Sequence, residues 1–162
     1  MRHGLGSEHP LCDKIQPLML ILFFAVWGID TACFLIFGYS TVILHALAFP
    51  ALFAGTIVFL CLSFYLVSKS HKAALEQAEA SPKLVDSGVY AWIRHPMYLG
   101  TLLFCFAFLF IGFSIVSFAV WVAFFVFYDR MATYEEKSLI KIIGEQYIAY
   151  QKRVSKWIPG VY

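Results

Sequence analysis

Long apolar segments without a single lysine or arginine constrain this chain more than any other feature. They cover residues 17–37, 41–68 and 97–128, and all twelve basic residues lie outside them. Each segment is long enough to cross the hydrocarbon core of a bilayer, which takes about 20 helical residues. Because 61% of the residues are hydrophobic and only 14% are charged, the chain is predicted to be an integral membrane protein with one all-α domain over residues 1–162.

The third apolar segment is too long for one membrane-crossing helix. It continues for 32 residues and contains Gly112-Phe113-Ser114 near its middle. A single very long helix is the alternative, but a hairpin that turns at these residues fits a bilayer better. The prediction is a polytopic helical bundle with four transmembrane helices, at about 17–37, 41–68, 97–111 and 114–128. The second helix is longer than a span requires, so it should tilt, kink near Pro50 or project past the membrane.

The distribution of positive charge predicts how these helices are oriented. Lysine and arginine lie only in the N-terminal residues, in the 69–96 loop and in the tail 129–162. The positive-inside rule therefore places both termini and the 69–96 loop in the cytoplasm, next to a bacterial or archaeal inner membrane or the endoplasmic reticulum. The first apolar segment is expected to be retained, because it is too long for a signal peptide and lacks a small-residue cleavage site.

The tail is predicted to form a cytoplasmic amphipathic helix. Apolar side chains recur there at helical spacing, at Leu139, Ile143, Tyr147, Tyr150 and Val154. Gly144 is expected to break this helix into two. Its apolar face packs under the bundle or lies on the bilayer surface.

Several functional classes are disfavoured. The net charge of +2 gives no reason to expect a nucleic-acid partner, and the four scattered cysteines lack the spacing of metal ligands, so no metal is expected. No Walker loop, HExxH motif or dinucleotide-binding GxGxxG is present.

Polar and aromatic residues gather in three segments on the predicted cytoplasmic side: 83–90, 94–100 and 129–136. A hairpin over 97–128 brings the second and third segments together. Each has a structural alternative, because Arg94 fits an interfacial anchor and Glu135-Glu136 fit a solvated helix face. Asp30, inside the first apolar run, is expected either to function or to pair with His45.

The sequence LVDSGVYAWIRHPMYLG, followed after the hairpin by DRMATYEEKSLIKIIGEQYIAYQKRVSKWIP, resembles the isoprenylcysteine carboxyl methyltransferase family. That family belongs to a wider group of integral membrane methyltransferases that includes phospholipid N-methyltransferases. The resemblance covers roughly residues 82–159. Residues 1–70 match only as generic transmembrane helices.

This resemblance implies that S-adenosylmethionine is the methyl donor and S-adenosylhomocysteine the product. Arg130 would bind the acceptor and, with Glu135, form the catalytic pair. The implied cofactor contacts are Pro82, Lys83, Leu84, Val85, Tyr90, His95, Pro96, Met97, Tyr98, Glu135 and Glu136. Of the RHPMY residues, His95 and Tyr98 are predicted to be functional in preference to Arg94.

The implied acceptor is lipophilic and enters from the lipid bilayer, with the carboxylate of a prenylated cysteine as the first expectation. A phospholipid, or another small lipophilic amine or thiol, is the alternative. A small four-helix transporter or scaffold is the non-enzymatic alternative.

The chain departs from the family at one point. In eukaryotic members the glutamate follows the arginine by about one helical turn, whereas here MATY separates Arg130 from Glu135, which is one residue more. Either the helix breaks there, or Glu135 and Glu136 exchange roles. The chain also has fewer predicted spans than eukaryotic members.

Overall fold

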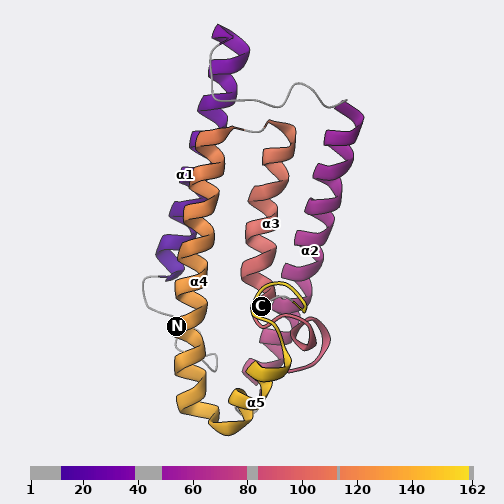
Figure 1. Cartoon of the computed structure of the whole chain (residues 1–162), viewed down its shortest axis with the longest axis vertical. Helices are drawn as coiled ribbons and strands as arrows, with labels where there is room; N and C mark the ends of the chain where they lie inside the picture. The colour runs from indigo at the N-terminus through magenta and orange to yellow at the C-terminus, as the bar shows by residue number, and fades with distance from the viewer. Residues whose placement is uncertain (1–11, 39–48, 80–83, 113, 161–162) are drawn as a thin grey trace. The chain divides into compact units, whose positions relative to one another are not determined.

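The described part of the chain is helical throughout, apart from its loops and turns. The computed structural model describes residues 12–38, 49–79, 84–112 and 114–160. Within these ranges the helices are α1 (Cys12–Phe37), α2 (Phe49–Glu79), the 3-10 turn η1 (Gly88–Ala91), α3 (Pro96–Ile111), α4 (Ile115–Ile143) and α5 (Glu145–Arg153) (Figure 1). The described ranges contain one isolated bridge and no β-strand, so the predicted all-α class is confirmed.

Three of these helices are long and apolar enough to cross a membrane. The candidate spans are Ile15–Phe37, Pro50–Ala73 and Ile115–Ile143, and Pro96–Ile111 is a shorter apolar helix. At 1.5 Å per residue α3 is about 24 Å long, less than a hydrocarbon core of about 30 Å. Large apolar side chains on α1 and α2 are exposed, with Leu35 at 75% and Phe64 at 76%. Lipid contact explains this exposure, and the chain is a multi-pass integral membrane protein.

The predicted break between the third and fourth helices is present. α3 ends at Ile111 and α4 begins at Ile115. The Ser114 side chain accepts a hydrogen bond from the Ser117 N–H at 3.1 Å, which is the geometry of an N-cap. The indole of Trp121 on α4 donates to the Leu102 carbonyl on α3 at 2.9 Å. The two helices therefore form the predicted hairpin, not one long helix.

Two helices continue further toward the C-terminus than their predicted spans. α4 passes through Tyr128 and continues to Ile143, so the predicted fourth span and the first part of the tail helix are one element. No glycine or proline interrupts α4 before Gly144, and the change from apolar to polar residues does not by itself end a helix. α2 likewise continues past Ser68 to Glu79, and Pro50 lies in its first turn, where proline is tolerated.

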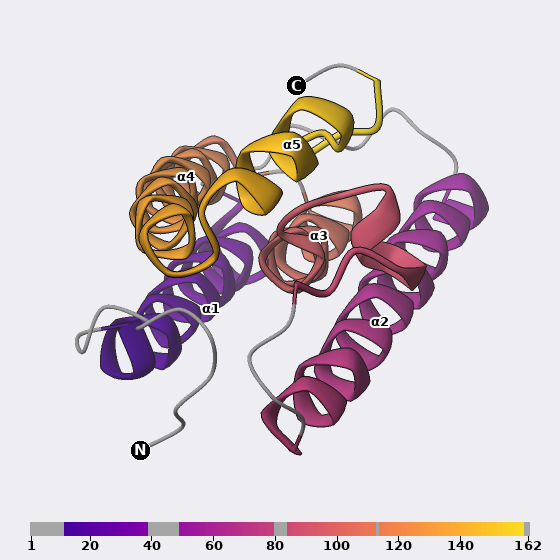
Figure 2. The same cartoon turned by 90° about the horizontal axis from the view of Figure 1, so that it is seen from below.

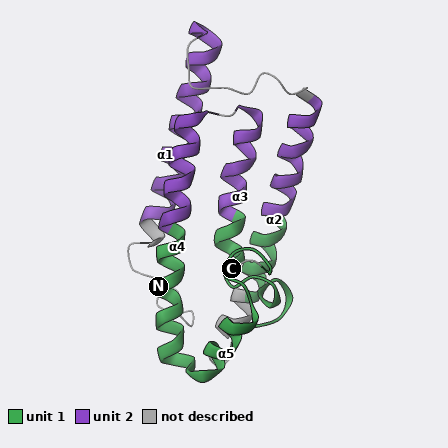
Figure 3. Cartoon of the chain, in the orientation of Figure 1, with its two compact units in different colours: residues 1–10, 64–100, 128–162 green, residues 11–63, 101–127 purple. Residues whose placement is uncertain are grey.

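The chain divides into two compact units, which are coloured separately in Figure 3. The described part of unit 2 consists of residues 12–38, 49–63, 101–112 and 114–127. Its core is aromatic and surrounds α3. Phe24 of α1 packs edge-on against Phe108 at 4.9 Å between ring centroids, and Phe59 of α2 packs against Phe110 at 5.0 Å.

Unit 1 contains the end of α2, the segment before α3, the end of α4, and α5 with the tail. Figure 2 shows α5 turning back from the end of α4 toward the segment that precedes α3. Gly144 has a φ of 71°, a left-handed conformation that ends α4 and lets α5 begin. The predicted apolar face of the tail is buried in one cluster, made of Tyr147, Tyr150 and Val154 with Leu84, Leu139, Ile140 and Ile143.

Asp30 is half-buried on α1, whereas His45, its predicted partner, lies outside the described residues. Cys33, Cys61 and Cys105 are free thiols.

The close contact between α2 and α3 at Gly55 gives a test of the packing. A Cβ at Gly55 would lie 2.8 Å from the Phe110 ring, whereas a Cβ at Gly28 meets nothing within 4 Å. We expect Gly55→Leu to lower the free energy of unfolding by about 1–3 kcal/mol more than Gly28→Leu, because overpacking forces the Phe110 ring to move. Unfolding of the purified variants in mixed micelles measures this difference, and equal stabilities would contradict the contact.

Candidate active site

The candidate site lies within unit 1 and starts at the turn that leads into α3. Gly88 has a φ of 62°, which lets the chain turn into η1 without strain. The His95 carbonyl accepts a hydrogen bond from the Leu99 N–H at 3.1 Å, so His95 caps the N-terminus of α3. Pro96 follows at the first helical position, where its missing N–H costs nothing. This turn therefore fixes His95 at the end of a helix.

One face of α4 supplies the carboxylates that meet this turn. Asp129, Thr133 and Glu136 are spaced by four and three residues, so they lie on one side of the helix. Glu135 is rotated by about 100° from Glu136. Because α4 is continuous through the MATY residues, the first alternative for the irregular spacing, a break in the helix, does not occur.

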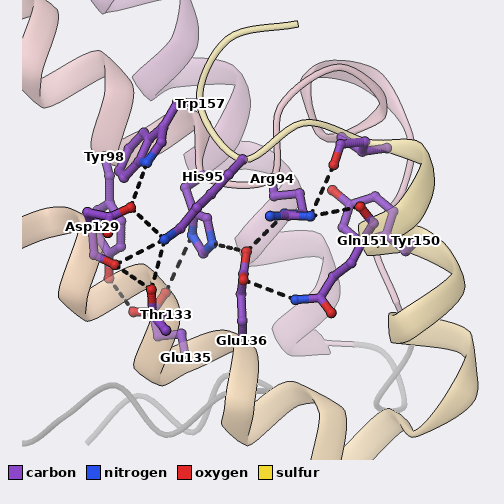
Figure 4. A network of polar contacts seen from close by, with 12 residues as sticks. Arg94, His95, Tyr98, Asp129, Thr133, Glu135, Glu136, Tyr150, Gln151 and Trp157 are labelled. Atoms are coloured by element: carbon purple, nitrogen blue, oxygen red, sulfur yellow. Dashed lines mark hydrogen bonds and ion pairs between the residues drawn. The ribbon is translucent and has the colours of Figure 1, made fainter. Parts of the chain in front are cut away.

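The carboxylate of Glu136 is the centre of a polar network (Figure 4). Its Oε1 lies 2.9 Å from Arg94 Nε and 3.0 Å from His95 Nε2. Its Oε2 accepts a hydrogen bond from the Gln151 side chain at 3.0 Å. The side chain of Glu136 is only 10% exposed, so these partners replace most of its hydration.

Arg94 connects the same network to the C-terminal helix. Its Nη1 donates to the carbonyl of Gln151 at 2.8 Å and to that of Val154 at 3.2 Å. Its backbone N–H donates to the Ser155 carbonyl at 2.9 Å. The side chain is 12% exposed. The interpretation of Arg94 as only an interfacial anchor is therefore wrong. Its guanidinium is buried and donates hydrogen bonds to backbone carbonyls at the C-terminal end of α5.

His95 is held as a neutral ring in this network. Burial lowers its pKa below the ordinary 6.5, and the hydrogen bond to Glu136 opposes this effect without reversing it. A neutral imidazole that donates from Nε2 to a carboxylate has an unprotonated Nδ1. That Nδ1 lies 3.7 Å from Glu135 Oε2, which is too far for a hydrogen bond. Two acceptor atoms therefore face each other.

Tyr98 contacts both residues that carry these acceptor atoms, and Tyr90 is anchored to neighbouring elements. The Tyr98 hydroxyl donates to Glu135 Oε1, and the Tyr98 ring stacks on His95 with centroids 5.8 Å apart. Tyr90 is hydrogen-bonded to Ser70 of α2, and burial raises its pKa, so its hydroxyl stays protonated at neutral pH. The Tyr90 carbonyl accepts a hydrogen bond from Tyr150 at 2.6 Å.

A second polar cluster joins α4 to the tail (Figure 4). The Lys156 ammonium donates to Asp129 Oδ1 at 2.6 Å and to Thr133 Oγ1 at 2.8 Å. The Trp157 indole N–H donates to the same Asp129 oxygen at 2.9 Å. The Trp157 ring also contacts His95, with centroids 6.1 Å apart. The tail is therefore fastened to α4 next to His95.

The structure brings together several of the predicted site residues. His95 lies against Tyr98, Glu135 and Glu136, and the Tyr98 hydroxyl donates to Glu135. Leu84 packs in the apolar cluster of unit 1, Val85 and Met97 are half-buried, and Pro96 is buried. Arg130 is exposed on α4. Pro82 and Lys83 lie outside the described residues.

Sequence reasoning missed the contributions of Gln151, Lys156 and Trp157. The spacing of Asp129, Thr133 and Glu136 on a continuous helix would have grouped these three residues. No comparable signal exists for the tail, because its contacts depend on the chain returning to α4 after Val154.

The groups of histidine, cysteine and acidic side chains in the described ranges include none that would hold a metal ion.

Comparison with known proteins identifies the family. The model of the phospholipid methyltransferase family matches residues 43–146, which is more than half of the chain. The protein-S-isoprenylcysteine O-methyltransferase of Xenopus laevis is 29% identical over 115 residues, covering 66% of this chain and 38% of that protein. The human enzyme of the same name is 44% identical over 86 residues, covering 48% of this chain and 28% of that protein. This chain thus spans well under half the length of either relative.

A solved structure shares the fold. The eukaryotic intramembrane Ras methyltransferase, isoprenylcysteine carboxyl methyltransferase, superposes with a TM-score of 0.62 at 24% identity, over 93% of this chain and 54% of that one. The resemblance stated from the sequence is thereby confirmed. From the family match and these relatives, the chain belongs to the phospholipid methyltransferase family of membrane proteins.

Proposed function

We propose that this chain is an integral membrane methyltransferase that uses S-adenosylmethionine to methylate the carboxylate of a prenylated cysteine. Family membership supports methyl transfer, and the relatives named above carry this acceptor in their names. The observation that carries the proposal is the pair of acceptor atoms in the site. His95 Nδ1 and Glu135 Oε2 lie 3.7 Å apart, and a cation with several N–H donors can donate to both.

The residues fit the cofactor. S-adenosylmethionine, when bound, supplies a methyl group on a positively charged sulfur, from which a nucleophile can displace it. Glu135 and His95 would hold its ammonium group. The N-terminal end of α3 carries the positive end of the helix dipole, which favours a carboxylate. The aromatic rings of Tyr90 and Tyr98 would lie against the sulfonium. Pro82, Lys83, Leu84 and Val85 are proposed to complete the binding surface before η1, with Pro96 and Met97 at the start of α3.

The two glutamates divide these roles. Glu136 already accepts from Arg94, His95 and Gln151. Its position is therefore structural, and it would orient His95. Glu135 lies on the side of Nδ1 and Tyr98. We therefore assign the cofactor contact to Glu135.

Arg130 would bind the acceptor. It lies on an exposed part of α4, outside the polar network that holds His95. A guanidinium can orient a carboxylate through two parallel hydrogen bonds. The acceptor carboxylate is already ionised at neutral pH, so transfer of the methyl group to it needs no general base. Orientation of the two reactants would be the main contribution of the protein.

Methylation of a phospholipid amine is the second candidate, because the matching family model is described by that substrate. An amine acceptor favours an acidic residue at the position of Arg130. The exposed guanidinium therefore favours a carboxylate acceptor over an amine.

The proposed orientation in the membrane follows from charge. Four transmembrane helices, with α3 as the short one, would place both chain ends and the site in the cytoplasm. The lipophilic part of the acceptor would then enter from the bilayer.

The reaction is tested directly with purified protein in lipid nanodiscs. Labelled S-adenosylmethionine and a farnesylated cysteine analogue are expected to give a methyl ester, which is identified by its lability to base. Cofactor binding without ester formation would refute the acceptor. Absence of saturable cofactor binding would refute the enzyme and favour a transporter or scaffold.

Glu135→Gln is expected to weaken cofactor binding by about tenfold or more, because a charge-assisted hydrogen bond to the ammonium is lost. Glu136→Gln should instead lower the thermal stability, because Arg94 loses its buried counter-charge. Calorimetric binding and thermal unfolding in nanodiscs distinguish the two effects. Glu145→Gln, on an exposed residue at the start of α5, is the matched control. The opposite pattern would exchange the roles of the two glutamates.

Arg130→Ala is expected to reduce turnover by at least about 100-fold, because two charge-assisted hydrogen bonds to the acceptor are lost. Cofactor affinity should remain within about twofold, because Arg130 lies outside the network around His95. Lys137→Ala, another exposed cation on α4, should retain turnover. Full activity of Arg130→Ala on the prenylated carboxylate would remove Arg130 from the acceptor site.

Cofactor affinity is expected to decrease as the pH falls through the folded-state pKa of His95, which lies below 6.5. Burial lowers the folded-state pKa of His95, so the ring stays neutral at pH 6.5 and becomes protonated only as the pH falls through that lower pKa. A protonated ring also repels the ammonium of the cofactor. Binding isotherms measured across this range check the effect, and His95→Gln should remove the dependence. A flat profile in the unmutated protein would contradict a role for neutral His95.

A further inference from the structure

The tail segment contains a lysine that is buried in the polar part of unit 1. Lys156 is 4% exposed, and its ammonium has three oxygen partners: the carbonyl and Oδ1 of Asp129, at 3.2 and 2.6 Å, and Oγ1 of Thr133 at 2.8 Å. A lysine on a protein surface usually extends its ammonium into water. Here all three donors have protein acceptors, so the charge is held at a defined position.

Trp157 extends this arrangement to His95. Its indole N–H and the Lys156 ammonium share Asp129 Oδ1, at 2.9 and 2.6 Å. The Trp157 ring is 4% exposed and contacts the His95 ring. His95 thus has ring contacts with both Tyr98 and Trp157. The contact with Tyr98 comes from α3, whereas the contact with Trp157 comes from the tail.

We propose that Lys156 and Trp157 are positioning residues that keep His95 as a neutral ring with its Nδ1 toward the cofactor. The inference rests on the proposed function. Lys156 acts through its fixed positive charge, which disfavours a second cation on the nearby imidazole. Trp157 acts as a wall that limits rotation of the ring. Asp129 and Thr133 hold both residues in place from α4.

The charges around His95 make this assignment testable. Glu135 and Glu136 of α4 favour protonation of the ring, whereas Lys156 of the tail and Arg94 before α3 disfavour it. Burial also disfavours protonation and is the largest effect. Removal of Lys156 therefore changes the balance toward the protonated ring. Removal of the Asp129 charge favours the neutral ring instead, because the negative charge that partly cancels the field of Lys156 at His95 is then lost.

The test is a pH titration of the His95 ring by ¹⁵N NMR, with histidine-labelled protein in nanodiscs and the signal assigned by its loss in His95→Gln. Lys156→Met should raise the apparent pKa of His95 by about half a unit or more, the effect expected of a nearby, partly desolvated charge. Asp129→Asn should lower it. Lys152→Met, an exposed lysine at the end of α5, should leave it unchanged.

Opposite shifts in Lys156→Met and Asp129→Asn would support the proposal, because simple damage to the fold does not produce effects of opposite sign. An unchanged His95 titration in both variants would overturn it. Asp129→Asn preserves the shape of the side chain. If Lys156→Met does not fold, a lowered pKa of His95 in Asp129→Asn supports the proposal and an unchanged one overturns it. Trp157→Phe keeps the wall but removes the indole hydrogen bond, so it should preserve the tautomer, whereas Trp157→Ala should broaden the ring signal.

The titration needs no cofactor, which separates this inference from the proposed function. The pH below which S-adenosylmethionine binding weakens should move upward in Lys156→Met and downward in Asp129→Asn. Shifts of the ring pKa without any cofactor binding would refute the proposed function and leave the electrostatic role of Lys156 intact. Normal binding with an unshifted pH dependence in both variants would refute the positioning role and leave the methyltransferase intact.

Discussion

The buried carboxylate of Glu136 is the interaction on which the described part of unit 1 depends. A carboxylate removed from water costs several kcal/mol unless cations and hydrogen-bond donors replace its hydration. Arg94 and His95 supply these partners from the turn before α3, and Gln151 supplies one from α5. Arg94 also binds the carbonyls at the end of α5. The turn before α3, α4 and α5 therefore supply hydrogen-bond and charge partners to one another, and loss of any one of them leaves buried polar groups of the other two without partners.

This dependence explains why two adjacent glutamates have different surroundings. Neighbouring residues on a helix point about 100° apart, so Glu136 faces the Arg94 guanidinium while Glu135 faces Nδ1 and Tyr98. The continuity of α4 also places Arg130 and Glu135 about 140° apart around the helix axis, because five residues exceed one turn by that angle. The arginine and the glutamate therefore do not share one face. Separate contacts, one with the acceptor and one with the cofactor, suit this arrangement better than a common one.

The elements that local sequence determines were predictable, and those that depend on distant contacts were not. Gly112 and Gly144 marked real breaks, and the apolar face of the tail from Leu139 to Val154 is buried as its spacing indicated. The continuity of α4 through Asp129 was missed, because composition indicates where a helix leaves an apolar environment and not where its backbone ends. Arg94 and Lys156 were beyond prediction for another reason. Both look like surface cations until the tail, after Val154, returns to pair with the backbone at Ile93.

In the proposed reaction, that return of the tail links the site to the membrane. Methylation of a lipophilic acceptor requires a polar, charged cofactor to meet a group that arrives from lipid. α4 carries exposed apolar residues such as Val126, then Arg130, then the two glutamates, all on one uninterrupted helix. A break at MATY would have let Arg130 and Glu135 move independently. The helix instead fixes the distance between Arg130 and Glu135, and the tail contacts at Asp129 and Glu136 hold that part of the helix against the turn that carries His95. The longer spacing is therefore compatible with the proposed reaction because the helix does not break there.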